Sequence, residues 1–190
     1  AFQSWGGVAV LADDTWAALK GRAALEVRWE LGENAVYDSE KYRQTLLASA
    51  RASGTPLREL GDTAAALGAA ARTVEAEYYV PHQPHVPMEP PVALARVEGG
   101  RCEVWASTQN PQAARNEAAR ALGLAVKDVT VHVTLLGGGF GRKSKADFVS
   151  EAVLLSREVN APVRVQWTRE DDVQHDYYNT VSQQRLVAGL

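Results

Sequence analysis

Apolar and polar positions recur along the chain with two different periods, and together they predict a mixture of helices and strands. Helical spacing predicts four helices, over residues 15–24, 40–52, 111–122 and 146–158. We expect Asn110 to cap the third of these and Gly123 to lie just past its end. Alternating or β-branched runs predict strands, over residues 7–12, 25–30, 73–80, 92–98, 101–107, 129–136 and 162–167. Gly99-Gly100 separates two of these strands and is a strong turn pair, which predicts a hairpin. We therefore expect an α+β fold, in which mixed sheets pack against helices.

The chain has one candidate internal boundary, in residues 53–72, which are rich in Gly, Ala and Thr. We predict that residues 1–62 are the end of an α/β subdomain and that residues 63–190 are the first part of a second domain. The chain starts without an initiator Met, close to a predicted strand, and stops on the apolar run Arg185–Leu190. These features lead us to expect a segment of a longer protein.

Composition removes several classes of function. The formal net charge of −3 and a pI of about 5.8 argue against general nucleic-acid binding. The single cysteine, Cys102, excludes an intrachain disulfide and a cysteine-based metal cluster, and we expect it to be buried packing. No apolar run reaches the roughly 18 residues that a membrane helix requires.

The most informative stretch is Gly137–Gly141, with four glycines among five residues, between a predicted strand and a predicted helix. Without Cβ atoms the backbone can turn sharply, and a ligand can approach its N–H groups closely. The start of the following helix would favour an anionic group, and Arg142 and Lys143 would add positive charge beside it. The simpler alternative is a tight turn followed by two solvated basic residues.

Two common nucleotide-binding loops do not fit this stretch. Arg142 occupies the position of the second glycine of a P-loop, although Lys143 and Ser144 fall in place. The dinucleotide fingerprint Gly-x-Gly-x-x-Gly fails as well, because neither possible register ends on a glycine. A small nucleotide-dependent enzyme that uses Lys143, or a non-catalytic α/β module that binds an anion or a nucleotide, stays open at this point.

A proline-rich segment over residues 81–91 is the second informative stretch, because five prolines fix an extended backbone there. The prolines keep its histidines off a helix, so we expect no metal site. We predict that His85 is a structural hydrogen-bonding residue and that Glu89 ties down a backbone turn. His175 lies among several aspartates and is expected to be solvated, whereas Gln109 reads locally as a plain loop amide.

Three segments, in this order and spacing, carry a resemblance to a known family: residues 82–90 (His-Gln-Pro-His-Val-Pro-Met-Glu-Pro), residues 107–110 (Ser-Thr-Gln-Asn) and Gly137–Gly141. The chain resembles, over most of its length, the molybdenum-cofactor subunit of the xanthine dehydrogenase and aldehyde oxidase family. The Pro-Met-Glu-Pro form, and Gly-Arg-Lys after the loop phenylalanine, are most similar to the branch of isoquinoline 1-oxidoreductase beta subunits. Residues 63–190 would then be the first part of the molybdopterin-binding domain.

The resemblance also implies which residues form the site. The positions that match the family's cofactor-binding loop are Gly138, Gly139, Phe140, Gly141 and Arg142. Gln109 occupies the position of a glutamine that hydrogen-bonds an oxygen on molybdenum, and it is the catalytic candidate. Ser144 stands where purine-oxidising members have a glutamate, which implies a substrate other than a purine. No residue of the chain is expected to ligate the metal directly.

The implied reaction of the whole enzyme is hydroxylation of an N-heterocycle or oxidation of an aldehyde, with water as the oxygen source. The implied cofactor is molybdenum–molybdopterin cytosine dinucleotide. Electrons would pass to an iron–sulfur small subunit, with a cytochrome c as a candidate further acceptor. The family's catalytic base is a glutamate far beyond residue 190, so we expect the chain alone to be inactive and to lack cofactor. The branch also implies a periplasmic location.

Overall fold

The computed structural model describes residues 7–190, and the chain divides into two compact units between Thr45 and Leu46. The first unit contains α1 (Thr15–Ala23), the 3-10 helix η1 (Gly32–Val36) and the start of α2 (Ser39–Arg51). Both α-helices begin as predicted, since Asp14 accepts a hydrogen bond from the backbone of the first turn of α1 and Asp38 does the same for α2. The predicted boundary between residues 62 and 63 stays a prediction.

The strands predicted in the first unit are wrong. Residues 8–12 and 25–30 are neither helical nor part of a strand. A β-branched run becomes a strand only where a second strand takes up its backbone N–H and C=O groups, and the sequence pattern carries no information about that partner. These two runs stay exposed over nearly all their length.

The second unit is built on a mixed four-stranded sheet with the order β4-β3-β2-β5. Its strands are β2 (Val92–Glu98), β3 (Arg101–Ala106), β4 (Val129–Val133) and β5 (Val163–Gln166). β2 pairs antiparallel with β3 and β5, whereas β3 and β4 run parallel. Gly99 and Gly100 join β2 to β3 with φ of 56° and 73°, so the predicted hairpin is confirmed.

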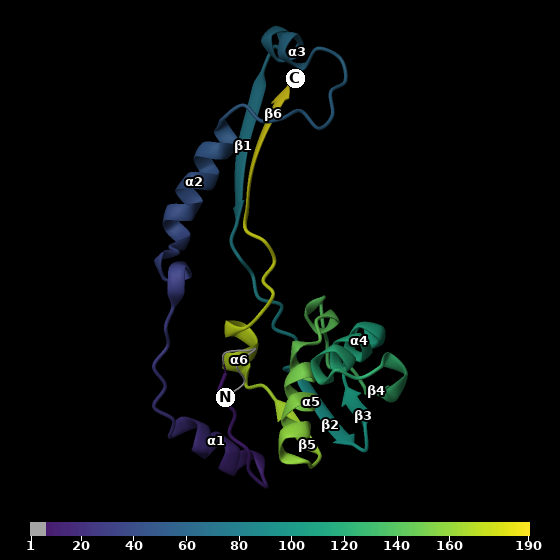
Figure 1. The fold of residues 1–190 in the computed structure, drawn as a ribbon. Coiled ribbons are helices and arrows are strands. Elements are labelled where there is room, and N and C mark those ends of the chain that lie inside the picture. The colour runs from purple at the N-terminus through teal and green to yellow at the C-terminus, as the bar shows by residue number, and fades with distance from the viewer. Residues whose placement is uncertain (1–6) are drawn as a thin grey trace. The chain divides into compact units, whose positions relative to one another are not determined.

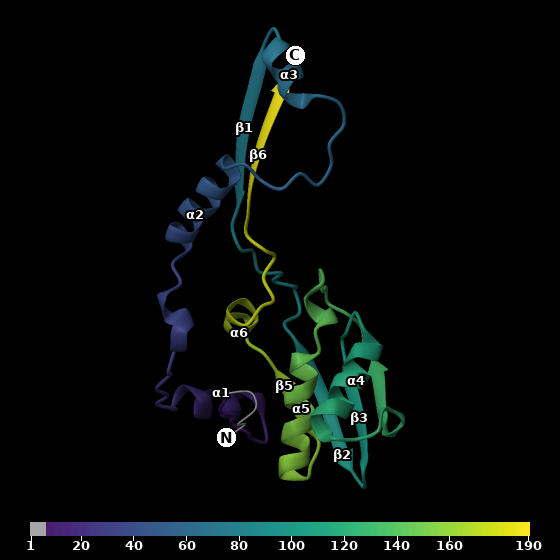
Figure 2. The same ribbon diagram turned by 45° about the horizontal axis from the view of Figure 1, so that its top comes forward.

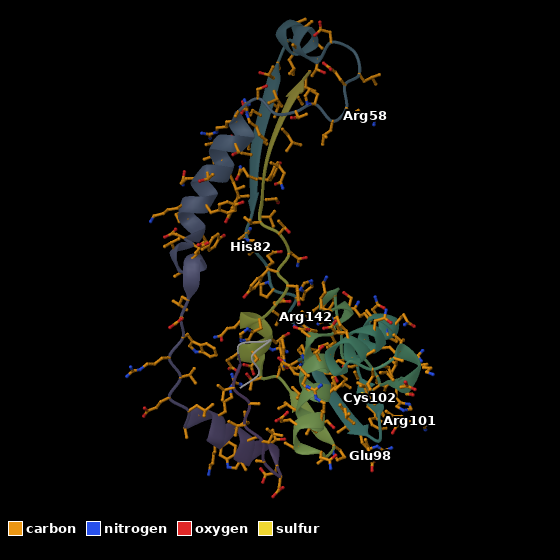
Figure 3. All side chains as sticks on the ribbon, in the orientation of Figure 1. Arg58, His82, Glu98, Arg101, Cys102 and Arg142 are labelled. Atoms are coloured by element: carbon orange, nitrogen blue, oxygen red, sulfur yellow. The ribbon has the colours of Figure 1, made fainter. Side chains whose placement is uncertain are left out.

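Helices α4 (Pro111–Leu122) and α5 (Asp147–Val159) pack against one face of this sheet (Figures 1 and 2). Asn110 caps α4 and Gly123 ends it in the left-handed region, as the sequence predicts. The core between helices and sheet includes Phe148 and also Cys102, which lies in β3 (Figure 3). Burial raises the pKa of the Cys102 thiol to about 11, so this side chain packs in the core and does not act as a nucleophile.

The remaining elements of the second unit include three that the sequence did not predict. α3 (Thr63–Ala69) and α6 (Arg169–Gln174) are short, and β6 (Ser182–Gly189) joins three polar residues to the start of the apolar run Arg185–Leu190. β6 pairs antiparallel with β1 (Thr73–Val80) over eight residue pairs. The α+β class with mixed sheets is confirmed, and no helix within residues 7–190 is long and apolar enough to span a membrane.

Candidate functional site

Three segments that are far apart in the sequence meet at one place in the second unit. The backbone of Glu89 donates to the carbonyl of Gly137 at 3.0 Å, which fixes the proline-rich segment to the glycine loop, defined here as Gly137–Gly141. The backbone of Gln109 donates to the carbonyl of Lys143 at 3.0 Å. The hydroxyl of Thr108 donates to the same carbonyl, also at 3.0 Å. The motifs singled out in the sequence are therefore parts of one site.

Several residues of the glycine loop have backbone angles that residues with side chains rarely adopt. Gly138 and Gly141 have φ of 90° and 106°, and Phe140 has φ of 53°. Gly139 has a different role, because a Cβ atom there would lie 2.3 Å from Oε1 of Gln109 and would displace the Gln109 amide. The loop is thus held in a fixed shape, packed closely against the segment that carries Gln109.

The N–H groups of this loop divide into two sets. Gly137 donates to Glu89 Oε2 at 3.1 Å. Gly141 donates to Gln109 Oε1 at 2.9 Å. Between them, the three inner N–H groups, of residues 138–140, have no hydrogen-bond partner among the residues that the structure describes. A loop with fixed, unpartnered N–H groups suits an anionic or oxygen-rich ligand.

Gln109 adds further donors beside the loop. Its Oε1 is occupied by the N–H of Gly141, and this contact determines which way the amide faces. Its Nε2 group has no partner within the described part of the chain, and the residue is exposed. Local sequence suggested only a loop amide, whereas the resemblance implied a ligand contact. In the structure the Gln109 amide lies beside the glycine loop and is bound to it through Gly141.

The expectation that Arg142 and Lys143 add exposed charge to the loop is wrong. Both side chains are fully buried. The Nζ of Lys143 contacts the carboxylate of Glu89 and lies 3.3 Å from Ser107 Oγ. Burial acts to raise the pKa of Glu89, but hydrogen bonds from Lys143, Ser107 and Gly137 hold it below the ordinary value. The Lys143 amine is therefore bound in the interior and does not face a phosphate, which argues against a nucleotide-dependent enzyme that uses Lys143.

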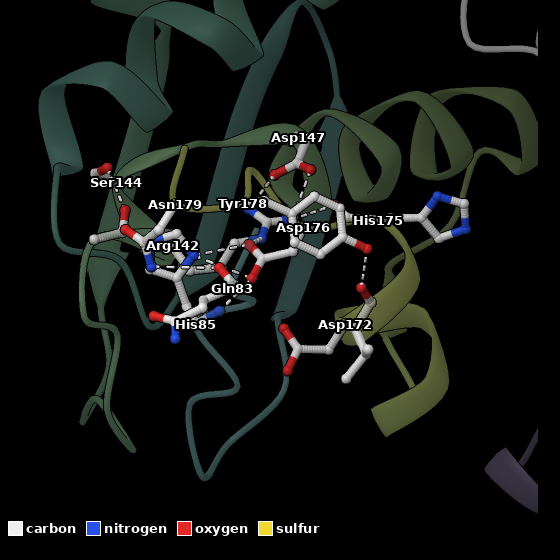
Figure 4. A network of polar contacts seen from close by, with 12 residues as sticks. Gln83, His85, Arg142, Ser144, Asp147, Asp172, His175, Asp176, Tyr178 and Asn179 are labelled. Carbon is white, nitrogen blue, oxygen red and sulfur yellow. Dashed lines mark hydrogen bonds and ion pairs between the residues drawn. The ribbon is translucent and has the colours of Figure 1, made fainter. Parts of the chain in front are cut away.

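Arg142 is the centre of a buried network behind the loop (Figure 4). Its guanidinium donates to both carboxylate oxygens of Asp147, at 3.0 and 2.8 Å, and lies 3.2 Å from Asp176 Oδ1. The rings of Trp167 and Tyr177 lie 5.0 and 5.2 Å from its central carbon. The backbone N–H of Arg142 also closes the loop onto the carbonyl of Gly139 at 2.9 Å. Its side chain thus supports the loop from inside the protein.

The start of the helix after the glycine loop was expected to favour an anionic ligand, but this helix begins several residues beyond the loop. A 3-10 turn, Arg142–Ser144, follows Gly141, and α5 starts only at Asp147. The first turn of α5 therefore carries a carboxylate, which is already bound by Arg142. The anion-binding donors are those of the loop itself rather than those of a helix end.

The segment around α6 is a part of the site that sequence reasoning missed. Arg169 donates to the carbonyls of Pro87 and Met88 at 2.7 and 3.0 Å, and so holds the proline-rich segment. His175 is exposed, as expected, but the neighbouring Asp172 and Asp176 side chains are fully buried. A run of acidic residues normally indicates a solvated surface, so the sequence contained no signal for this arrangement.

Two predictions for the proline-rich segment are confirmed, those for Glu89 and His85. Glu89 ties down the backbone at Gly137, and His85 is a structural hydrogen-bonding residue whose Nδ1 lies 3.0 Å from Asp176 Oδ1. Within residues 7–190, no group of three or more His, Cys, Asp or Glu side chains is arranged to hold a metal ion.

Glu151 is bound to Trp167, whose ring lies against Arg142, so the pKa of Glu151 tests how well this region is buried. Its Oε2 accepts a hydrogen bond from Trp167 Nε1 at 2.7 Å, and burial raises its pKa from 4.5 to about 7 despite that bond. Between those two values the folded state binds more protons than the unfolded state, so stability falls as the pH rises through this window. We expect Glu151→Gln to be more stable than the parent near pH 8, by on the order of 2 kcal/mol, and to show little advantage near pH 4.

Urea unfolding of both proteins across this pH range measures the difference. Glu158→Gln is the matched control, because Glu158 is exposed on the same helix. An advantage of Glu151→Gln that does not change with pH would contradict the raised pKa.

Comparison with known proteins agrees with this geometry. Residues 49–189 match the family described as the molybdopterin cofactor-binding domain. The chain belongs to this family. It is 30% identical to a nicotinate dehydrogenase subunit of Pseudomonas putida over 183 residues, covering 96% of this chain and 15% of the relative. It is 29% identical to the isoquinoline 1-oxidoreductase beta subunit of Brevundimonas diminuta, covering 97% of this chain and 25% of the relative.

A solved structure supports the fold. Aldehyde oxidoreductase from Desulfovibrio gigas superimposes with a TM-score of 0.59 at 23% identity, covering 67% of this chain and 14% of the other. The chain thus spans a quarter or less of the length of these three proteins.

The residues of the glycine loop fit the cofactor of this family. An anionic, oxygen-rich group needs hydrogen-bond donors and a backbone that it can approach, and residues 138–140 with the Gln109 amide provide both. Glu89, the nearby carboxylate, is bound by Lys143 and Gly137, so its charge is offset.

Proposed function

We propose that these residues form part of the cofactor wall of a molybdenum hydroxylase, which hydroxylates an N-heterocycle or oxidises an aldehyde with oxygen from water. The observation that carries the proposal is the glycine loop with three unpartnered N–H groups beside the free amide donors of Gln109. The names of the relatives support it, since nicotinate and isoquinoline are N-heterocycles. The rival, a non-catalytic anion- or nucleotide-binding module, would not require a redox partner.

The chain's own residues would have distinct tasks in this site. The bound molybdenum cofactor supplies the two-electron redox chemistry. The N–H groups of residues 138–140 hold its anionic atoms, and Gln109 donates from Nε2 to an oxygen of the same group. Phe140, whose side chain is 75% exposed, forms an apolar edge of the loop. Ser144 replaces the glutamate of purine-oxidising members, which favours a substrate other than a purine.

Several finer points belong to the same proposal. We infer that the cofactor is the cytosine dinucleotide form and that the enzyme includes an iron–sulfur small subunit, with a cytochrome c as acceptor, in the periplasm. The similarity to proteins that are named as single subunits of larger enzymes supports a partner subunit. The cofactor form, the acceptor and the location rest on the resemblance of the sequence motifs to the isoquinoline 1-oxidoreductase branch. We expect no turnover from residues 1–190 alone, because they correspond to a quarter or less of those subunits.

The test is to produce the polypeptide that contains these residues together with its small subunit, and to measure molybdenum and acid-released nucleotide. We expect about one molybdenum and one CMP per polypeptide, and a severalfold lower kcat in Gln109→Leu at near-normal molybdenum content. Release of a nucleotide other than CMP would change only the proposed form of the cofactor. A purified complex that contains neither metal nor pterin would refute the function and favour the binding module.

A further inference from the structure

His85 and Asp176 form a buried pair at the edge of the glycine loop that the proposed function does not use (Figure 4). Asp176 is fully buried, and the His85 side chain is 10% exposed. Nδ1 of His85 lies 3.0 and 3.1 Å from the two carboxylate oxygens of Asp176, and the His85 backbone N–H donates to the same carboxylate. Arg142 lies on the other side of Asp176, with its Nε 3.2 Å from Oδ1.

These contacts determine which nitrogen of His85 carries the proton. Both oxygens of the Asp176 carboxylate face donors, since the His85 backbone N–H donates to Oδ2 and Nε of Arg142 lies 3.2 Å from Oδ1, so the carboxylate acts as the acceptor in these contacts. Nδ1 must therefore be the donor, and in the neutral imidazole Nε2 is then an acceptor. Asp176 fixes both the tautomer and the orientation of the ring, as carboxylates do for histidines in other sites.

Nε2 of His85 faces the loop. It lies 3.4 Å from the position that a Cβ of Gly141 would occupy, and it has no hydrogen-bond partner within the described part of the chain. The unpartnered groups described above for this site are donors: the N–H groups of residues 138–140 and the amide of Gln109. A side-chain acceptor next to a set of donors favours a ligand that has a donor of its own.

We propose that His85 binds the ligand of the glycine loop by accepting a hydrogen bond at Nε2, and that Asp176 is the residue that positions it. The ligand class is an anionic or oxygen-rich group that carries an O–H or N–H donor beside its acceptor atoms. This inference rests on the proposed function only in taking the loop as a ligand site. The tautomer of His85 can be measured without any ligand.

Imidazole ¹⁵N NMR of the 190-residue chain tests the positioning role directly. We expect a protonated Nδ1 and an unprotonated Nε2 for His85, and a mixture of tautomers in Asp176→Ala. Exposed His132, which lies in β4 and not in this network, serves as the internal reference and should not change. A His85 ring that carries its proton on Nε2 in the unmodified chain overturns the proposal, even if Asp176→Ala does not fold.

Phosphate and sulfate test the ligand contact. Near pH 8 both anions carry about two negative charges, but only phosphate keeps an O–H. We expect phosphate to bind about five- to tenfold more tightly than sulfate, and His85→Phe to abolish that preference. His132→Phe, on a sheet strand away from the loop, is the matched control and should retain it. Equal affinities in the unmodified chain overturn the contact. If neither anion binds, the loop is not an anion site. The NMR measurement of the His85 tautomer would still test the role of Asp176.

Discussion

Gly139→Ala is expected to reduce the molybdenum content of the assembled enzyme by at least about tenfold while leaving the fold intact. The added Cβ would lie 2.3 Å from Oε1 and 2.6 Å from Cδ of Gln109, much closer than any real contact. The backbone at Gly139 does not have positive φ, so the damage is steric and local. The Gln109 amide must move away, and Gly141 loses its hydrogen-bond acceptor. Both the shape of the loop and a donor to the cofactor are lost together.

A pair of variants separates this explanation from general destabilisation. Gly139→Ala combined with Gln109→Ala removes the collision, so the double variant should hold more molybdenum than Gly139→Ala alone. Gly68→Ala in α3 is the control, because no heavy atom lies within 4 Å of a Cβ added there. Molybdenum is measured by elemental analysis, and circular dichroism reports the fold. Full molybdenum content in Gly139→Ala would show that the loop tolerates a side chain and does not approach the cofactor closely.

The sequence predicted the parts of the site that local chemistry determines. The cap at Asn110, the Gly99-Gly100 turn and the glycine loop all follow from backbone preferences of particular residues. The order of three motifs then indicated the family. The predicted strands over residues 7–12 and 25–30 failed, since pairing is a property of the whole fold rather than of the run itself.

The buried charges could not be predicted in the same way. Arg142 and Lys143 follow a glycine-rich turn, where basic residues are usually solvated, yet each is buried against a carboxylate from a distant segment. Glu89 lies 54 residues before Lys143, and Asp176 lies well beyond it in the chain. No local pattern connects these positions, so only the fold reveals that the loop is supported by ion pairs from behind.

Arg142→Met is expected to have the largest effect on stability. It keeps an apolar stem of similar length but leaves Asp147 and Asp176 without their shared cation in the interior. Removing one partner of a buried ion pair typically costs about 3–5 kcal/mol, because the remaining charge is neither solvated nor paired. We expect a loss in this range in the free energy of unfolding, measured by urea denaturation of the 190-residue chain. Arg58→Met, at an exposed position, should change it by less than about 0.5 kcal/mol.

A second substitution shows whether the loss comes from the network. Asp147→Asn added to Arg142→Met removes one stranded charge, so the double variant should recover part of the stability, with a coupling energy of about 1–3 kcal/mol. Arg142→Lys keeps the charge but cannot form the two parallel bonds to Asp147, and an intermediate loss is expected. Strict additivity of the two substitutions would mean that Arg142 stabilises the chain through its packing between Trp167 and Tyr177 instead. In that case the aromatic rings, rather than the carboxylates, would hold the residue that closes the glycine loop.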